Sequence, residues 1–215
     1  MTNLLFFISL AVLLLAIANP MLKKHYILIK SVTSILFCII ALINFTSSKV
    51  NHWIILMLPI LLCMVGDVSL GFYQMHKKSM YFKLGLCSFL VAHILFVLHM
   101  HIISSVTFIE LLLALGGIGL TYLMDKMGII NFAKHKLACM TYSFFVTLLL
   151  VKGSVIAITL QTPLAYTYAL ASLLFFVSDF ILMFMYFRKS NTILHVFNLS
   201  TYYMAMFLFA NILHR

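Results

Sequence analysis

Long runs of hydrophobic residues, separated by short polar breaks, make up almost the whole chain. Each run is continuous rather than alternating between apolar and polar positions, which favours membrane-spanning helices over the strands of a barrel. A bilayer core of about 30 Å requires about 20 apolar residues per helix. The pattern predicts eight spans, over residues 3–22, 26–46, 53–73, 81–101, 104–124, 137–159, 164–187 and 192–213.

Composition supports this all-α, polytopic membrane fold. Hydrophobic residues make up 65% of the chain and charged residues 8%, and the mean hydropathy is +1.17. A water-soluble globule with such a composition is excluded. We expect a single integral membrane domain over residues 1–215, with no room for a soluble domain. The first apolar segment, residues 4–18, lacks a preceding basic region and is interpreted as a retained helix rather than a signal peptide.

The net charge of +10 lies mostly at the ends of the apolar runs. This placement is typical of topology signals and contacts with anionic membrane lipids, and it does not indicate a nucleic-acid partner. The odd-numbered connections carry Lys23, Lys24, Lys77, Lys78, Lys126, Lys134, Lys136, Arg188 and Lys189, whereas the other side carries only Lys49, Lys152 and Arg215. The positive-inside rule then predicts cytoplasmic odd connections and both termini outside. The short loops are typical of a protein of the bacterial cell membrane.

Two of the four acidic residues stand in matching apolar stretches, VGDVSLGF at 65–72 and VSDFILMF at 177–184. A charged side chain near the bilayer centre costs about 3 kcal/mol, so Asp67 and Asp179 are expected to face the protein interior and to carry function. Both are predicted to lie about 6 Å to the cytoplasmic side of the midplane, at 1.5 Å per helical residue. The match predicts two parallel four-helix repeats, residues 1–102 and 103–215, unless the short pattern recurs by chance.

Other polar residues are expected near the same level and predict a polar cavity open toward the inner leaflet. One helical face carries Lys30, Thr33 and Ser34, another carries His195, Asn198 and Tyr202, and the fourth and sixth spans supply His93 and Tyr142. The alternative role for the histidines, Asn198 and Tyr202 is hydrogen bonding between helices. For Lys30 the alternative is a lysine whose ammonium reaches the inner interface.

The remaining polar and small residues are assigned structural roles. Glu110, near the start of the fifth span, is interpreted as lying at the outer interface. The cysteines show no metal-ligand or disulfide spacing and are interpreted as small core residues: Cys38, Cys63, Cys87 and Cys139. Glycines that permit close helix approach are Gly85, Gly116, Gly117 and Gly119.

Four segments stand in order along the chain: GDVSL at 66–70, GLCSFLVAHILF at 85–96, LLFFVSDFIL at 173–182 and YYMAM at 202–206. They are preceded by YILIKSVTSILF at 26–37. Together these segments resemble the YhhN family of membrane proteins, in which residues 26–37 are similar to the early lysine segment. The characterised animal members of the family are lysoplasmalogenases. The chain departs from the family pattern at Ser31, where Pro is typical, and at Met206, where Gln is common. Both aspartates are retained.

The resemblance implies hydrolysis of the vinyl ether bond of a lysoplasmalogen, a lysophospholipid, to a fatty aldehyde and a glycerophospho-alcohol. This chemistry needs a protonated acid, a carboxylate and water, and a buried pair of carboxylates can retain one proton at neutral pH. Asp67 and Asp179 are the predicted catalytic pair. The residues expected to contact substrate are Lys30, which would hold the phosphate, and His93, Tyr142, Asn198 and Tyr202. We expect no cofactor and no metal.

Two other functions fit the same residues. A proton-coupled transporter or channel for a small or lipid-like substrate would also place acidic residues inside the membrane in duplicated halves. It would normally contain helices broken by Gly or Pro, and Pro59 is a partial example. A non-catalytic lipid-binding or scaffold protein would bind a lysolipid without forming product.

Overall fold

The computed structural model describes residues 1–47 and 53–212, and in these ranges the chain forms helices and no strand. Seven of the described helices are long and apolar enough to cross a membrane, and an eighth, Thr2–Ala18, is apolar but shorter. The predicted all-α, polytopic fold is therefore confirmed, with one apolar helix for each predicted run. Of the residues used to predict the orientation, Lys49 and Arg215 lie outside the described ranges.

The chain forms two compact units. The first consists of residues 1–96 and 206–215, and the second of residues 97–205. Two helices, α5 (Ser79–Ile103) and α9 (Thr192–Asn211), contribute residues to both units. The predicted sequence repeat, with halves 1–102 and 103–215, stays a prediction.

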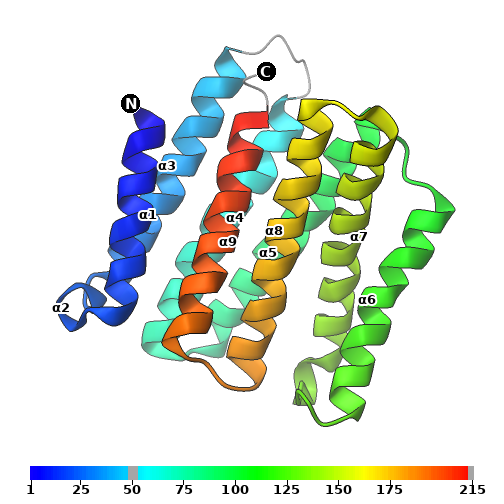
Figure 1. Cartoon of the computed structure of the whole chain (residues 1–215). Helices are drawn as coiled ribbons and strands as arrows, with labels where there is room; N and C mark the ends of the chain where they lie inside the picture. The colour runs from blue at the N-terminus through cyan, green and yellow to red at the C-terminus, as the bar shows by residue number, and fades with distance from the viewer. Residues whose placement is uncertain (48–52, 213–215) are drawn as a thin grey trace. The chain divides into compact units, whose positions relative to one another are not determined.

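In the first unit, α1 (Thr2–Ala18) packs against α3 (Tyr26–Thr46), and α3 packs against α4 (Trp53–His76) (Figure 1). The core contains fully buried aromatic residues, Phe6, Phe37 and Phe45. The end of α9 belongs to this unit, where the Nδ2 of Asn44 donates to the carbonyl oxygen of Ala210 at 2.9 Å. This bond gives a partner to one of the carbonyls that a helix end leaves without an intrahelical donor.

The first predicted span, residues 3–22, is not continuous in the structure. Helix α1 ends at Ala18, and the short helix α2 (Pro20–Lys23) follows. Asn19 has an extended backbone with ψ of 116°, as expected for a residue that precedes proline. Its side chain accepts a hydrogen bond from the backbone N–H of Met21 at 2.9 Å and so caps the new helix.

Helices α4 and α5 approach closely in the first unit because glycines face the partner helix. A Cβ placed on Gly66 would lie 2.6 Å from the ring of Phe89, and one on Gly85 would lie 2.7 Å from the side chain of Leu70. The buried side of α5 near this contact carries Phe89, Ala92 and His93. Gly85 therefore has the predicted packing role.

In the second unit, α6 (Phe108–Lys126), α7 (Lys136–Leu160) and α8 (Pro163–Phe187) lie side by side in chain order (Figure 1). A short 3-10 helix, η1 (Ala133–His135), precedes α7. Gly117 of α6 meets α7, since an added Cβ would lie 2.6 Å from the carbonyl oxygen of Ser143. Nothing lies within 4 Å of such a Cβ at Gly116 or Gly119, so the prediction of close packing is confirmed for Gly117 and wrong for these two.

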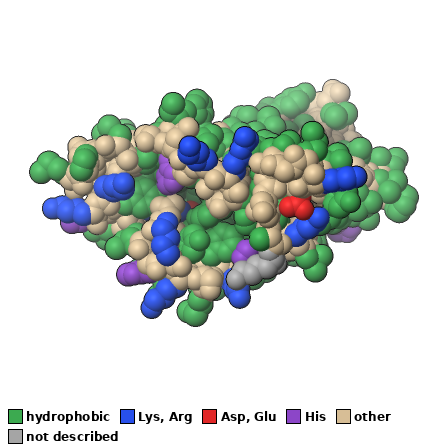
Figure 2. Space-filling model, turned by 90° about the horizontal axis from the view of Figure 1, so that it is seen from below, with side chains coloured by type: hydrophobic (Ala, Val, Ile, Leu, Met, Phe, Trp, Pro, Cys, Tyr) green, Lys and Arg blue, Asp and Glu red, His purple; other side chains and the backbone are tan. Residues whose placement is uncertain are grey.

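The connections that follow α2, α4, α6 and α8 carry exposed basic residues. In the view from below, Lys and Arg side chains are exposed among hydrophobic and other side chains (Figure 2). The exposed basic residues of these connections include Lys23, Lys24, Lys77, Lys78, Arg188 and Lys189. Lys152, in contrast, was counted among the basic residues of the other side although it falls within the predicted span 137–159. It lies inside α7 with no exposed surface, so it carries no topology signal.

Three of the four cysteines match the predicted core role. Cys38, Cys63 and Cys139 are buried free thiols, whereas Cys87 is exposed on α5. The core interpretation is therefore wrong for Cys87. Its neighbours in the helix, Gly85 and Phe89, lie on the opposite, buried side.

Candidate active site

Asp67 is held in the first unit by two side chains from one face of α3. The Nζ of Lys30 lies 3.1 Å from Oδ1 of Asp67, and the Oγ of Ser34 lies 2.7 Å from Oδ2. All three residues are buried, with 5%, 0% and 2% of their surface exposed for Lys30, Ser34 and Asp67. We call these three residues the Asp67 cluster.

The helical spacing of α3 produces this arrangement. Lys30 and Ser34 are four residues apart, so they stand on the same side of the helix, one turn from each other. Ser34 Oγ also lies 3.1 Å from the carbonyl oxygen of Lys30. A hydroxyl has one hydrogen to donate, and the shorter, charge-assisted bond to Asp67 is the stronger choice.

Gly66, next to Asp67 in α4, faces helix α5. The glycine lets the ring of Phe89 pack directly against the backbone of α4 next to the aspartate. His93 lies one helical turn beyond Phe89 on α5 and has no exposed surface. Gly66 and Phe89 thus belong to one packed α4–α5 contact within the first unit, and His93 lies on the same buried side of α5.

Asp179 is held in the second unit by a tyrosine. The Tyr142 hydroxyl on α7 donates to Oδ2 of Asp179 on α8 at 2.7 Å. Asp179 is 8% exposed, and Tyr142 is half-buried. We call this pair the Asp179 cluster.

Helix α9 is fastened beside Asp179 by Asn198. Its Nδ2 donates to the carbonyl oxygen of Ser178 at 2.8 Å and lies 3.0 Å from the Ser178 hydroxyl. Tyr202, one turn further along α9, is 4% exposed and packs edge-on against Phe175 with ring centroids 5.5 Å apart. These bonds join helices next to the Asp179 cluster, and substrate contact by Asn198 or Tyr202 stays a prediction.

The two clusters share a spacing along the chain. Tyr142 precedes Asp179 by 37 positions, and Lys30 precedes Asp67 by the same separation. In each case the residue on the earlier helix directs a polar hydrogen at the carboxylate of the next long helix. The shared spacing is what the predicted repeat would produce, although the donors are chemically different.

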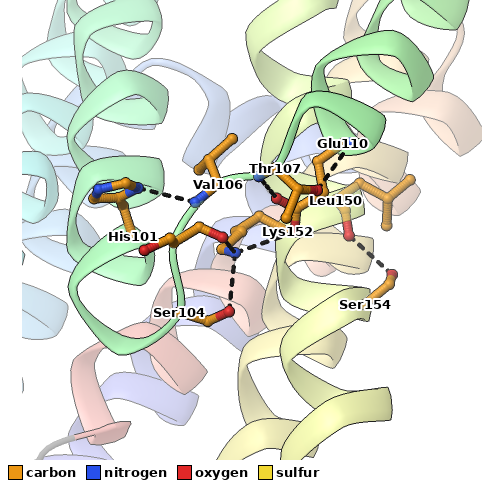
Figure 3. A network of polar contacts seen from close by, with 9 residues as sticks. His101, Ser104, Val106, Thr107, Glu110, Leu150, Lys152 and Ser154 are labelled. Atoms are coloured by element: carbon orange, nitrogen blue, oxygen red, sulfur yellow. Dashed lines mark hydrogen bonds and ion pairs between the residues drawn. The ribbon is translucent and has the colours of Figure 1, made fainter.

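A second buried ion pair was not expected from the sequence. The Nζ of Lys152 on α7 lies 3.1 Å from Oε1 of Glu110 on α6, 2.9 Å from the carbonyl oxygen of Ser105 and 3.3 Å from the Ser104 hydroxyl (Figure 3). Glu110 is 1% exposed, and its other oxygen accepts from the backbone N–H of Thr107. Glu110 thus stands in the first turn of α6, but its side chain is buried in an ion pair and does not reach an exposed interface.

The Lys152 network is complete and structural. An ammonium group has three hydrogens, and Lys152 has three acceptors around it. Glu110 and Thr107 form a capping box that begins α6. One signal could have revealed the pair: two opposite charges stood in adjacent predicted spans, where an unpaired charge is costly.

The comparison with protein families decides the affiliation of this chain. The model of the YhhN family matches residues 25–213. The chain belongs to the YhhN family. The YhhN match includes both clusters, and the family is associated with hydrolase activity, at the level of a lysoplasmalogenase-like function. No curated protein and no solved structure matches this YhhN chain.

Proposed function

We propose that this YhhN protein hydrolyses the vinyl ether bond of lysoplasmalogens, such as lysoplasmenyl-ethanolamine or lysoplasmenyl-choline. The products are a fatty aldehyde and glycerophospho-ethanolamine or glycerophospho-choline. The observation that carries the proposal is family membership over nearly the whole chain, together with two buried aspartates that each accept a polar hydrogen from a neighbouring helix.

The reaction assigns one role to each carboxyl group. The acid transfers its proton to the β-carbon of the vinyl ether, and an oxocarbenium ion forms. The carboxylate stabilises this cation and takes a proton from the water that adds to the α-carbon. The resulting hemiacetal then collapses: its hydroxyl proton returns to the first group, and the second group protonates the leaving glycerol oxygen.

Paired carboxylates around an oxocarbenium-like transition state are the chemistry of glycosidases, which serve here as an analogy. We assign the two roles to Asp67 and Asp179. The proposed substrate contacts are Lys30, His93, Tyr142, Asn198 and Tyr202. A site toward the cytoplasmic leaflet, with both termini outside, remains part of the proposal.

The test measures aldehyde release from lysoplasmenyl-ethanolamine by purified, folded protein, with an ester-linked lysolipid as the substrate control. Removing a general acid or base typically costs on the order of 10²- to 10⁴-fold, so Asp67→Asn and Asp179→Asn should each lose at least about 100-fold in turnover. Asp125→Asn is the matched control, because Asp125 lies at the end of α6 in a partly exposed pair with Lys136.

Near-normal turnover in both Asp→Asn variants would refute the carboxylate pair. Absence of release from the folded wild-type protein would refute the hydrolase. Ion-dependent uptake into proteoliposomes without chemical change would then favour the transporter, and tight lysolipid binding without product would favour the lipid-binding protein.

A further inference from the structure

The Asp67 cluster surrounds both oxygens of one carboxyl group with donors. Lys30 approaches Oδ1 at 3.1 Å, and the Ser34 hydroxyl approaches Oδ2 at 2.7 Å. An ammonium group donates only, so Oδ1 must be an acceptor in this arrangement. A positive charge this close stabilises the ionised form of a carboxyl group, and the Ser34 hydroxyl offers a second donor. The contacts therefore favour the carboxylate over a carboxyl group whose proton is available to a substrate.

Burial strengthens this argument. Lys30 is 5% exposed and Asp67 is 2% exposed, so neither charge is solvated by bulk water. A buried charge requires a partner of opposite sign, and removal of one partner leaves the other uncompensated. The Lys30 ammonium thus compensates the negative charge of Asp67 inside the first unit.

We propose that Lys30 and Ser34 are positioning residues that hold Asp67 as the ionised carboxylate of the hydrolytic reaction. Asp67 then stabilises the oxocarbenium ion and activates water, and the proton donor in the proposed division of roles is Asp179. The inference rests on the proposed function and deepens it. It also gives Lys30 a role different from holding the substrate phosphate.

The first experiment separates a carboxylate partner from a phosphate contact. Two substrates carry the same vinyl ether: lysoplasmenyl-ethanolamine, and a 1-O-alkenyl glycerol that has no phosphate. If Lys30 acts through Asp67, Lys30→Met lowers kcat by the same factor on both substrates, on the order of 100-fold, as for loss of the base itself. Lys30→Arg restores part of the activity on both because it keeps the positive charge.

Two further variants complete the comparison. Ser34→Ala removes one donor and should lower kcat on both substrates by a smaller equal factor. Lys24→Met is the matched control, since Lys24 is exposed just before α3, and it should behave like the wild type. A Lys30→Met effect confined to KM of the phosphate-bearing substrate would overturn the proposal.

The second experiment does not need activity. The infrared difference spectrum between the wild type and Asp67→Asn at neutral pH isolates the absorption of this carboxyl group. A carboxylate band is expected in the wild type. The difference spectrum between Lys30→Met and the double variant Lys30→Met/Asp67→Asn should show the carbonyl band of a protonated acid. A protonated-acid band in the wild type would overturn the proposal.

The two measurements test the hydrolase and the ionised state of Asp67 separately. If the wild-type protein releases no aldehyde, the proposed hydrolase fails, whereas the infrared spectrum still decides whether Asp67 is ionised. If aldehyde is released but Asp67 is protonated, the hydrolase stands and this inference is refuted. A Lys30→Met variant that does not fold leaves the wild-type spectrum, Lys30→Arg and Ser34→Ala to decide.

Discussion

Replacing Lys152 with Met removes the positive member of the buried ion pair in the second unit. Met is close to Lys in length, so the change removes the charge with little change in packing. Glu110 then remains 1% exposed, with its negative charge opposite a methyl group. The backbone N–H of Thr107 is its remaining polar partner in the network of Figure 3.

The loss of stability expected for Lys152→Met follows from the geometry of the ion pair. At 3.1 Å, and with an effective dielectric constant of about 20, two unit charges attract by about 5 kcal/mol. The cost of removing both charges from water is of similar size, so the intact pair contributes little net stability. Breaking it is different: an uncompensated buried charge typically costs about 3–5 kcal/mol.

The assay follows a buried thiol in the same unit. Cys139 is 8% exposed at the start of α7, and labelling requires local opening or unfolding. In a background in which the other three cysteines are alanine, a maleimide should label Lys152→Met roughly 100- to 5,000-fold faster than the parent protein, since each 1.36 kcal/mol corresponds to a factor of ten. Lys126→Met is the control, because Lys126 is exposed at the end of α6 and should label like the parent.

The double variant Glu110→Gln/Lys152→Met tests whether charge is the cause. Gln retains the capping box, and both buried charges are gone. Replacement of both members of a buried pair is often neutral, so labelling of Cys139 should return to within about tenfold of the parent. Parent-like labelling of Lys152→Met, or a double variant as labile as the single one, would refute the reasoning.

Two further predictions concern the second unit. Gly117→Ala should lower the thermal unfolding temperature, because its Cβ would clash with the side chain of Thr147, whereas Gly116→Ala has open space and should leave the temperature unchanged or raise it. Equal effects of the two variants would contradict the assigned packing. Tyr142→Phe removes the hydroxyl that donates to Asp179 and should lower kcat on vinyl ether substrates by about tenfold, the equivalent of a hydrogen bond of about 1.5 kcal/mol to a charged or polar group. Unchanged turnover in folded Tyr142→Phe would show that this bond does not position the aspartate.

The positions of the membrane helices were predictable because each is dictated by its own stretch of sequence. A helix that crosses hydrocarbon must be apolar over its length, and so the runs at 26–46, 164–187 and 192–213 correspond to α3, α8 and α9 within a few residues. The break after Ala18 was missed because apolar residues continue past Pro20. Its signal was local chemistry, an asparagine followed by a proline, and not hydropathy.

The importance of the two aspartates was also a property of the sequence, because a carboxyl group in an apolar run is costly wherever its helix packs. The partners of the two aspartates could not be predicted from the sequence. Ser34 and Lys30 were on one face of a predicted helix, but Asp67 is 33 residues beyond Ser34, and Asp179 is 37 residues beyond Tyr142. The identity of each donor depends on which helix packs beside the aspartate and which face that helix presents to it. Hydropathy does not encode either property.

Glu110 and Lys152 show most clearly which properties the sequence determines and which only the tertiary structure decides. The sequence determined that the chain consists of apolar helices, with Glu110 and Lys152 in two neighbouring predicted helices, because each residue has its own cost of transfer into the bilayer. Only the tertiary structure decided that the two charges, 42 positions apart, are buried together as a pair. The physical reason is that transfer cost is a property of single residues, whereas compensation of a buried charge is a property of contacts that exist only after folding.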